Sequence, residues 1–212
     1  MKSMRVIAAA FAFVGVFAAP ALAVPIVVMV GDNDGYGPLG VPDNGVAVWP
    51  GPGGSGTDYD GRSLAEALAV NGAQITDVYS AIFPDFGPNP SELASVFFPL
   101  PDILLSGTLT IDMGDFQAEA GGPIAANING VPLSLFFEDG FQNTVVRSFI
   151  LSPAQIAAAN LAGQVILNLD HTGSGDFIAF DYFRLDGEVV PEPATLTLLG
   201  LGLTGLALRR KA

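Results

Sequence analysis

The sequence predicts a mainly β protein, a β-sandwich of jelly-roll type with one or two short helices. Three observations support this fold class. Apolar and polar residues alternate in several short segments, residues typical of turns stand between these segments, and helical signals occur at only two places. A series of about eight short strands separated by turns is typical of sandwiches and jelly rolls.

The alternation is clearest in the second half of the chain. From Leu105 to Met113 the odd-numbered positions hold apolar residues or glycine, and the even-numbered positions are polar. Ile124 to Ile128 alternates in a similar way, and Asn129-Gly130 is a turn signal between this strand and Leu133 to Glu138. The other predicted strands are Ile26 to Val30, Val46 to Trp49, Ile75 to Phe83, Thr144 to Leu151, Gln164 to Asp170 and Phe177 to Leu185.

Two segments have helical signals. Ser152 is a suitable N-cap residue, Pro153 suits the first helical position, and Gln155 completes a capping box. These residues predict a helix that begins there and ends at Gly163. A second, shorter helix is predicted over Arg62 to Val70.

The N-terminus, residues 1–23, has the three parts of a secretory signal peptide. Two basic residues precede the apolar segment Ile7 to Phe17, which is long enough for a signal peptide and too short to span a bilayer. Small residues at Ala21 and Ala23 form an A-x-A site, so we expect signal peptidase to cleave before Val24.

The C-terminus, residues 191–212, has a different pattern. Pro191, Glu192 and Pro193 precede an apolar segment, Ala194 to Leu208, and the basic residues Arg209, Arg210 and Lys211 follow it. A helix over the apolar segment is about 22 Å long, against a hydrocarbon core of about 30 Å. The short span and the basic cluster favour a hydrophobic helix that anchors the protein in the inner membrane only transiently.

Motif, apolar segment and basic terminus together resemble the PEP-CTERM sorting signal of Gram-negative bacteria. The resemblance implies that an exosortase, a membrane-embedded transpeptidase, cuts near Pro191-Glu192-Pro193 and removes the tail. It also implies that the processed protein reaches the outer surface or the extracellular biofilm matrix of a cell that makes exopolysaccharide. The alternative interpretation is an ordinary C-terminal membrane anchor.

The segment between the two ends, residues 24–190, is predicted to form one acidic domain. It holds three arginines and no lysine against 20 acidic residues, a net charge of −17. Such a field repels nucleic acid and attracts divalent cations, although solubility alone also explains an acidic exported domain. The absence of cysteine excludes disulfides, thiolate metal sites and a cysteine nucleophile.

A candidate structural calcium site lies in the turn after the first predicted strand. Asp32, Asp34 and Asp43 supply carboxylates at spacings that suit an oxygen cage, and we expect Asp181, or Asp176, to join them. The pattern fails as an EF-hand, because no helices flank it. The alternative is an ordinary surface turn, since Asp, Asn and Gly are common turn residues.

The domain also resembles others that precede this sorting signal, through segments 30–37, 110–116 and 176–183. The segment 176–183 is similar to the last strand of galactose-binding-like jelly rolls, which include carbohydrate-binding modules. That resemblance implies a structural calcium where the first and last strands meet.

Candidate glycan contacts are Trp49, Tyr36 and Tyr59, which lie in or beside a Gly- and Pro-rich loop region; the alternative is core packing. No catalytic residue is predicted. The single histidine, His171, lies in a predicted turn where we expect a solvated side chain. We therefore expect a non-enzymatic surface or matrix protein that binds exopolysaccharide. The alternatives are a purely structural or adhesive surface protein, and a secreted glycan-active enzyme.

Overall fold

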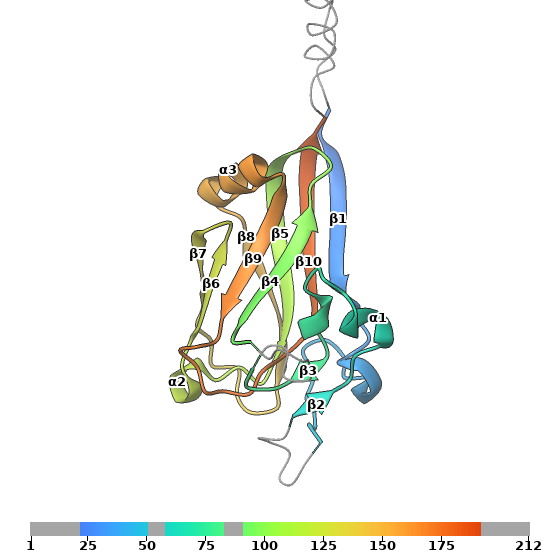
Figure 1. Cartoon of the computed structure of the whole chain (residues 1–212), viewed down its shortest axis with the longest axis vertical. Coiled ribbons are helices and arrows are strands. Elements are labelled where there is room, and N and C mark those ends of the chain that lie inside the picture. The colour runs from blue at the N-terminus through green and yellow to red at the C-terminus, as the bar shows by residue number, and fades with distance from the viewer. Residues whose placement is uncertain (1–21, 51–57, 83–90, 192–212) are drawn as a thin grey trace, which may run out of the picture. The chain divides into compact units, whose positions relative to one another are not determined.

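The computed structural model describes residues 22–50, 58–82 and 91–191. Five of the predicted processing residues lie outside these ranges: Ala21, Glu192, Pro193, Arg209 and Arg210. Eight main strands form two four-stranded antiparallel sheets, with orders β1-β10-β5-β8 and β4-β9-β6-β7 (Figure 1). Their bounds are β1 Val24–Gly31, β4 Leu93–Pro99, β5 Ile103–Gly114, β6 Ile124–Ile128, β7 Val131–Leu135, β8 Thr144–Ile150, β9 Gln164–Asp170 and β10 Ala179–Val190.

The strand order is that of a jelly roll. Strand β1 pairs with β10, β4 with β9, β5 with β8 and β6 with β7, so the pairs are nested along the chain like those of one long hairpin. Successive pairs alternate between the two sheets. The predicted fold class, a β-sandwich with a few short helices, is confirmed.

The main core lies between the two sheets. Strands β5 and β9 each present one apolar face to it, because side chains of a strand alternate between the two faces. Leu109, Ile111 and Met113 on β5 are fully buried, and Val165 and Leu167 on β9 face them from the other sheet. This alternation is the pattern from which the strands were predicted.

Several predicted elements have the expected bounds. Strand β9 has the predicted limits, and β6 is followed by a tight turn in which Asn129 (φ 50°) and Gly130 (φ 84°) are both left-handed. Helix α3 (Pro153–Ala162) begins at Ser152, whose side chain accepts the N–H of Gln155 in a full capping box. It ends at Gly163, which has φ 69°. The second helix, α1 (Leu64–Ala67), is shorter than predicted.

Other predictions were wrong in part. Val46 to Trp49 forms no strand and contributes only a bridge from Val46 to Asn143. The strand predicted over Ile75 to Phe83, described up to residue 82, is mostly absent: a 3-10 helix (Ala73–Ile75) ends at its first residue, and the two-residue strand β3 (Val78–Tyr79) follows and pairs with β2 (Tyr59–Asp60). The segment expected to run to Glu138 ends as a strand at Leu135.

The sequence did not predict strand β4, and the predicted environment of His171 was wrong. Leu93–Pro99 carries few alternating polar residues and follows a proline-rich segment, so its sequence does not show a strand pattern. His171, expected to be solvated, is fully buried at the end of β9, and desolvation lowers its pKa.

Two β-bulges interrupt the alternation in the central pair of strands, β5 and β10. One lies between Glu188 and Val189 on β10, opposite Leu105, so that Leu104 is buried and Leu105 is half exposed. The other places Asp181 and Tyr182 of β10 opposite a single residue, Asp112 of β5. Bulges often re-aim a side chain beside a functional site, and this one turns Asp181 into the protein.

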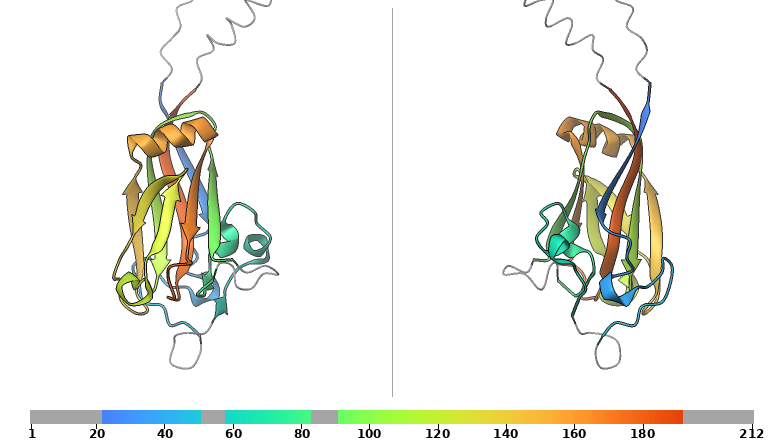
Figure 2. Two further views of the ribbon diagram at one scale, coloured as in Figure 1. Left: turned by 60° about the vertical axis from the view of Figure 1, so that its left-hand side comes forward. Right: turned by 90° about the vertical axis from the view of Figure 1, so that its right-hand side faces the viewer.

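The two ends of the described domain lie side by side. Val24 at the start of β1 pairs with Val189 near the end of β10, and helix α3 covers this end of the sandwich (Figures 1 and 2). The opposite end carries α1, β2, β3 and the loops between the sheets (Figure 2). Within the described ranges no helix combines the length and the apolar character needed to cross a membrane.

Candidate metal centre

Seven carboxylates converge at the end of the sandwich opposite the two termini of the domain. They form three groups of three, and within each group one ligand atom of every residue lies within 4.8 Å of the others. We call these seven residues the acidic cluster. Its groups are Asp32, Glu66 and Asp77; Asp34, Asp77 and Asp181; and Asp43, Asp112 and Asp181.

Asp181 links two of the groups and is held by backbone donors. It lies in the bulge of β10 and is fully buried. Its carboxylate accepts the N–H of Tyr36 at 2.9 Å and that of Gly35 at 3.3 Å. Both donors lie in left-handed backbone (φ 62° and 81°), which aims successive N–H groups at one point. Burial raises the pKa of Asp181, and these hydrogen bonds oppose that rise.

Asp77 is shared by the Asp32 group and the Asp34 group, and within the described residues neither of its side-chain oxygens accepts a hydrogen bond from an N–H or O–H group; its side-chain neighbour is the carboxyl of Asp181. It is 1% exposed, and its backbone is fixed by bonds from its N–H to the carbonyl of Phe180 (2.7 Å) and from the N–H of Gly61 to its carbonyl (2.8 Å). Its φ of 57° is uncommon for a residue with a side chain. A buried, unpartnered carboxylate is costly unless a proton or a cation neutralises it.

Desolvation raises the pKa of Asp77 strongly, and the negative charges of Glu66, Asp34 and Asp181 raise it further. Without a cation, Asp77 therefore holds a proton at neutral pH, and that proton can bridge to Asp181. With a cation, the proton leaves and the oxygens become ligands.

Asp112 and Asp43 complete the third group. Asp112 occupies a position on β5 that the alternation assigns to the outer face, yet it is fully buried because the segment after β1 covers that face. One of its oxygens accepts the hydroxyl of Tyr36 at 3.1 Å, and the other has no partner. Desolvation raises the pKa of Asp112 to about 7. Tyr182 directs its hydroxyl toward Asp43 at 3.4 Å.

Each of the three arginines of the domain forms an ion pair with an acid outside the acidic cluster. Arg62 pairs with Asp60 at 2.7 Å, Arg184 pairs with Asp186 at 2.6 Å, and Arg147 pairs with Asp139. Since the domain contains no lysine, its charge is balanced by protons or by cations from solution.

The donor set suits a hard divalent cation. The ligand atoms are carboxylate oxygens, and three oxygens within 4.8 Å of one another can all lie at the 2.3–2.6 Å that Ca²⁺ prefers. Mg²⁺ requires shorter, octahedral coordination, which a cluster assembled from five separate segments satisfies less readily.

All four predicted metal ligands belong to the acidic cluster, although no one group contains them all. Asp32, Asp34 and Asp43 fall in different groups, and Asp181 joins two of them. The alternative candidate, Asp176, lies elsewhere, where it accepts the N–H of Gln117 at 2.9 Å.

Sequence reasoning missed three members, Glu66, Asp77 and Asp112. Asp112 sat in an alternating strand and looked solvent-facing. Asp77 lies between Thr76 and Val78 in a segment predicted to be a strand, and nothing in that pattern marks it as a metal ligand.

The burial of Trp49 and Tyr36 contradicts the prediction that these side chains contact a glycan. Trp49 is 1% exposed and stacks on Tyr79 with ring centroids 4.3 Å apart, while Tyr36 meets Trp49 edge to face. Both belong to a second apolar cluster that packs over Gly114 on the outer side of β5. Tyr59 is partly buried, and its hydroxyl donates to the carbonyl of Tyr36. Core packing therefore accounts for Trp49 and Tyr36.

A separate pocket of about 290 Å³ lies at the same end of the sandwich. Phe141 and Phe177 give it an aromatic wall, and Phe141 is 43% exposed. Asp115, Asp176 and Gln117 supply polar atoms. Desolvation raises the pKa of Asp176 to about 6.

Comparison with known proteins gives little beyond the C-terminus. No curated protein matches the chain. Among solved structures, dimeric latent PorU from Porphyromonas gingivalis is similar over 82% of this chain, at 12% identity and a TM-score of 0.37. This chain spans 14% of the length of that protein.

The C-terminal comparison concerns the sorting signal. A family model described as the PEP-CTERM protein-sorting motif matches residues 189–211. Such a motif indicates an exported protein that is anchored transiently in a membrane and processed by an exosortase. The chain is therefore an exported surface protein that carries a PEP-CTERM sorting motif and is an exosortase substrate.

Proposed function

We propose that this protein is a non-enzymatic component of the outer surface or biofilm matrix of a Gram-negative bacterium, and that it binds exopolysaccharide in a calcium-dependent manner. The observation that carries the proposal is the acidic cluster, above all the buried Asp77 carboxylate, which accepts no hydrogen bond from an N–H or O–H group of the described residues. A cation there neutralises the buried negative charge of the carboxylates, which the folded protein otherwise neutralises by binding a proton. The aromatic pocket at Phe141 and Phe177 supports sugar contact, because aromatic faces and carboxylate acceptors suit a hydroxylated ring.

Calcium binding is tested first, by thermal unfolding of the exported, processed protein in millimolar Ca²⁺ and in EDTA. We expect a higher Tm in Ca²⁺, because a ligand that binds only the folded state stabilises it by mass action. Asp77→Asn is the informative variant. Asparagine has nearly the same shape, tolerates left-handed backbone and carries no charge. This variant should be at least as stable as wild type in EDTA and should lose most of the calcium response.

Asp186→Asn is the matched control, because Asp186 lies on β10 in an exposed ion pair. It should keep the calcium response of the wild type. An equal Tm in Ca²⁺ and in EDTA for the wild-type protein would contradict the calcium part of the proposal.

Polysaccharide binding is tested with the exopolysaccharide purified from the same organism, with and without Ca²⁺. Saturable binding that EDTA abolishes supports the proposal. No binding in either condition favours the structural or adhesive role in its place.

One observation favours a glycan-active enzyme as the second candidate. Asp115 and Asp176 line one pocket, and a carboxyl with a pKa near 6 has the property of a general acid in glycoside hydrolysis. Release of reducing sugars from the same polysaccharide, abolished in Asp176→Asn, would establish this activity. Glycan binding without product release supports the non-enzymatic function.

A further inference from the structure

One group of the acidic cluster opens onto a pocket. Asp32 and Glu66 line a hollow of about 250 Å³, together with Met29, Ser63 and Ala69. Asp32 is exposed at its mouth, whereas Asp77 is buried and shares a group with both. The three carboxylates therefore run from the solvent side into the protein.

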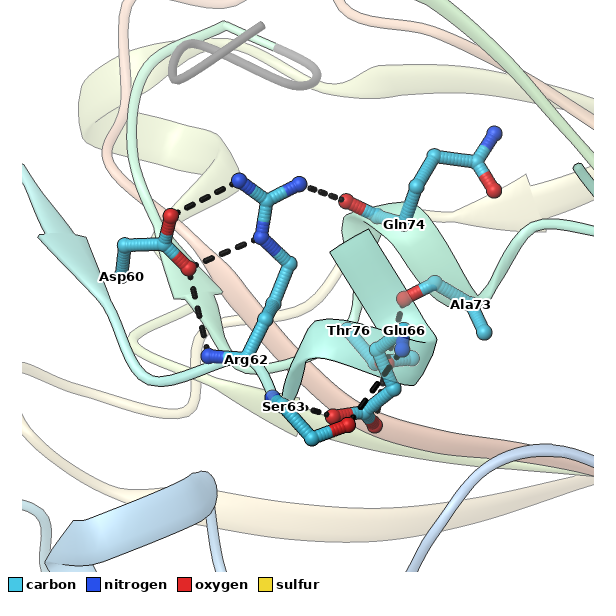
Figure 3. A network of polar contacts seen from close by, with 7 residues as sticks. All are labelled: Asp60, Arg62, Ser63, Glu66, Ala73, Gln74 and Thr76. Atoms are coloured by element: carbon cyan, nitrogen blue, oxygen red, sulfur yellow. Dashed lines mark hydrogen bonds and ion pairs between the residues drawn. The ribbon is translucent and has the colours of Figure 1, made fainter. Parts of the chain in front are cut away.

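Glu66 is fixed in place by the first turn of helix α1, in which it is the third residue. It is 7% exposed, and its carboxylate accepts the N–H of Ser63 at 2.9 Å and faces the hydroxyl of Thr76 at 3.2 Å (Figure 3). The side chain of Ser63 in turn accepts the N–H of Glu66, which completes a capping box. These hydrogen bonds fix the conformation of the Glu66 side chain, so that its carboxylate lies beside those of Asp32 and Asp77.

The neighbouring arginine holds the adjacent turn and is directed to other acceptors. Arg62 donates to Asp60 through its backbone N–H and two side-chain nitrogens, and it donates a further bond to the carbonyl of Gln74 at 2.8 Å (Figure 3). In the group of Asp32, Glu66 and Asp77, the buried Asp77 carboxylate accepts no hydrogen bond from an N–H or O–H group of the described residues, and this is the independent sign of a missing ligand.

We infer that Asp32, Glu66 and Asp77 hold a second, solvent-facing Ca²⁺ ion, whose open positions take hydroxyl or carboxylate oxygens of a polysaccharide from the pocket. Ca²⁺ requires six to eight oxygens, and the three carboxylates supply fewer, because both oxygens of Glu66 are already engaged by hydrogen bonds. The remaining ligands come from the pocket side, as water or as sugar oxygens. This inference rests on the proposed function and names the residues through which it acts.

The two groups that contain Asp181 each have one exposed carboxylate, Asp34 or Asp43, but they are built around buried carboxylates that are already engaged. Asp181 and Asp112 are fully buried, and both oxygens of Asp181 already accept backbone N–H groups. A cation bound there stabilises the loop end of the fold. A cation beside Asp32 has the additional property that an outside molecule can reach it.

The test compares Glu66→Gln and Asp32→Asn with the wild type in the full, processed protein. Glutamine at this position preserves the capping box, so Glu66→Gln should keep the wild-type Tm in EDTA. Native mass spectrometry in Ca²⁺ should show one bound ion fewer in each variant. Polysaccharide binding in Ca²⁺ should weaken at least about tenfold, the loss expected for one direct metal contact of about 1.4 kcal/mol.

Two defined polymers identify the donor oxygens: polygalacturonate offers carboxylates, and mannan offers vicinal hydroxyls. Binding of either polymer that is lost in both variants supports the inference. An unchanged number of bound ions, or unchanged binding, in both variants overturns it.

Phe141→Ala distinguishes this site from the aromatic pocket. If Phe141→Ala abolishes binding while Glu66→Gln and Asp32→Asn bind like the wild type, the inference fails and the proposed function stands. If the wild-type protein binds no polysaccharide at all, the proposed function itself fails.

Discussion

The carboxylate of Asp181 accepts the backbone N–H of Tyr36 at 2.9 Å, across 145 residues of sequence. This bond attaches the segment after β1 to the last strand at the bulge. It also places Asp181 between two groups of the acidic cluster. The contact therefore supports both the loop end of the sandwich and the candidate metal centre.

Asp181→Ala should be strongly destabilising even without a cation. The variant leaves the N–H groups of Gly35 and Tyr36 without their acceptor in a buried place, which costs about 2–4 kcal/mol in the free energy of unfolding. Urea unfolding in EDTA measures this loss separately from calcium. Asp186→Ala is the control, and it should cost under about 1 kcal/mol because its ion pair is partly exposed. Equal losses in the two variants would contradict the structural role of Asp181.

Trp49 should behave as a core residue. It is the only tryptophan and is buried against Tyr79, so its fluorescence should be blue-shifted in the native protein and shift to the red on unfolding. Trp49→Ala should lower the free energy of unfolding by about 3–5 kcal/mol. Trp49→Phe should cost less, because it keeps an aromatic ring on Tyr79. A native emission maximum like that of free tryptophan would show that the indole is exposed.

Asp176 should make stability depend on pH in a defined direction. Desolvation raises its pKa from 3.8 to about 6. Protonation of the Asp176 carboxyl therefore stabilises the folded state relative to the unfolded state. Its contribution to stability is complete below about pH 4 and is lost as the pH rises through about 6. Because the group is only partly buried, the effect is on the order of 1 kcal/mol after solvent screening.

Asp176→Asn removes this titration. In EDTA the variant should match the wild type near pH 4 and be more stable by about 1 kcal/mol near pH 7.5, as measured by urea unfolding at both pH values. The same difference at the two pH values would mean that ionisation of Asp176 is not its cause.

The N-cap of α3 should contribute a small and separable amount. Ser152→Ala removes the acceptor of the Gln155 N–H and should lower the free energy of unfolding by about 1 kcal/mol. Ser152→Asp, which restores an acceptor at the N-cap, should recover most of this loss. Calcium binding should be unchanged in both, since α3 lies at the other end of the sandwich (Figure 1).

The sequence by itself determined the elements that depend on near neighbours. The capping box at Ser152, the turn at Asn129-Gly130 and the alternation along Gln164 to Asp170 are local signals, and each produced the expected element. The sorting motif at residues 189–211 is likewise read from consecutive residues. Even the jelly-roll class followed from the number and spacing of short strands.

Only the tertiary structure decided which acids meet and which aromatic rings are buried. Asp77 and Asp112 gave no metal signal, because their partners lie far away in the chain and are brought close by strand pairing. A bulge turned Asp181 inward, and bulge positions depend on register between strands. Trp49 is covered because β3 and the segment after β1 fold over the outer face of a sheet. Burial is a property of the whole packed fold, and so local pattern does not determine it.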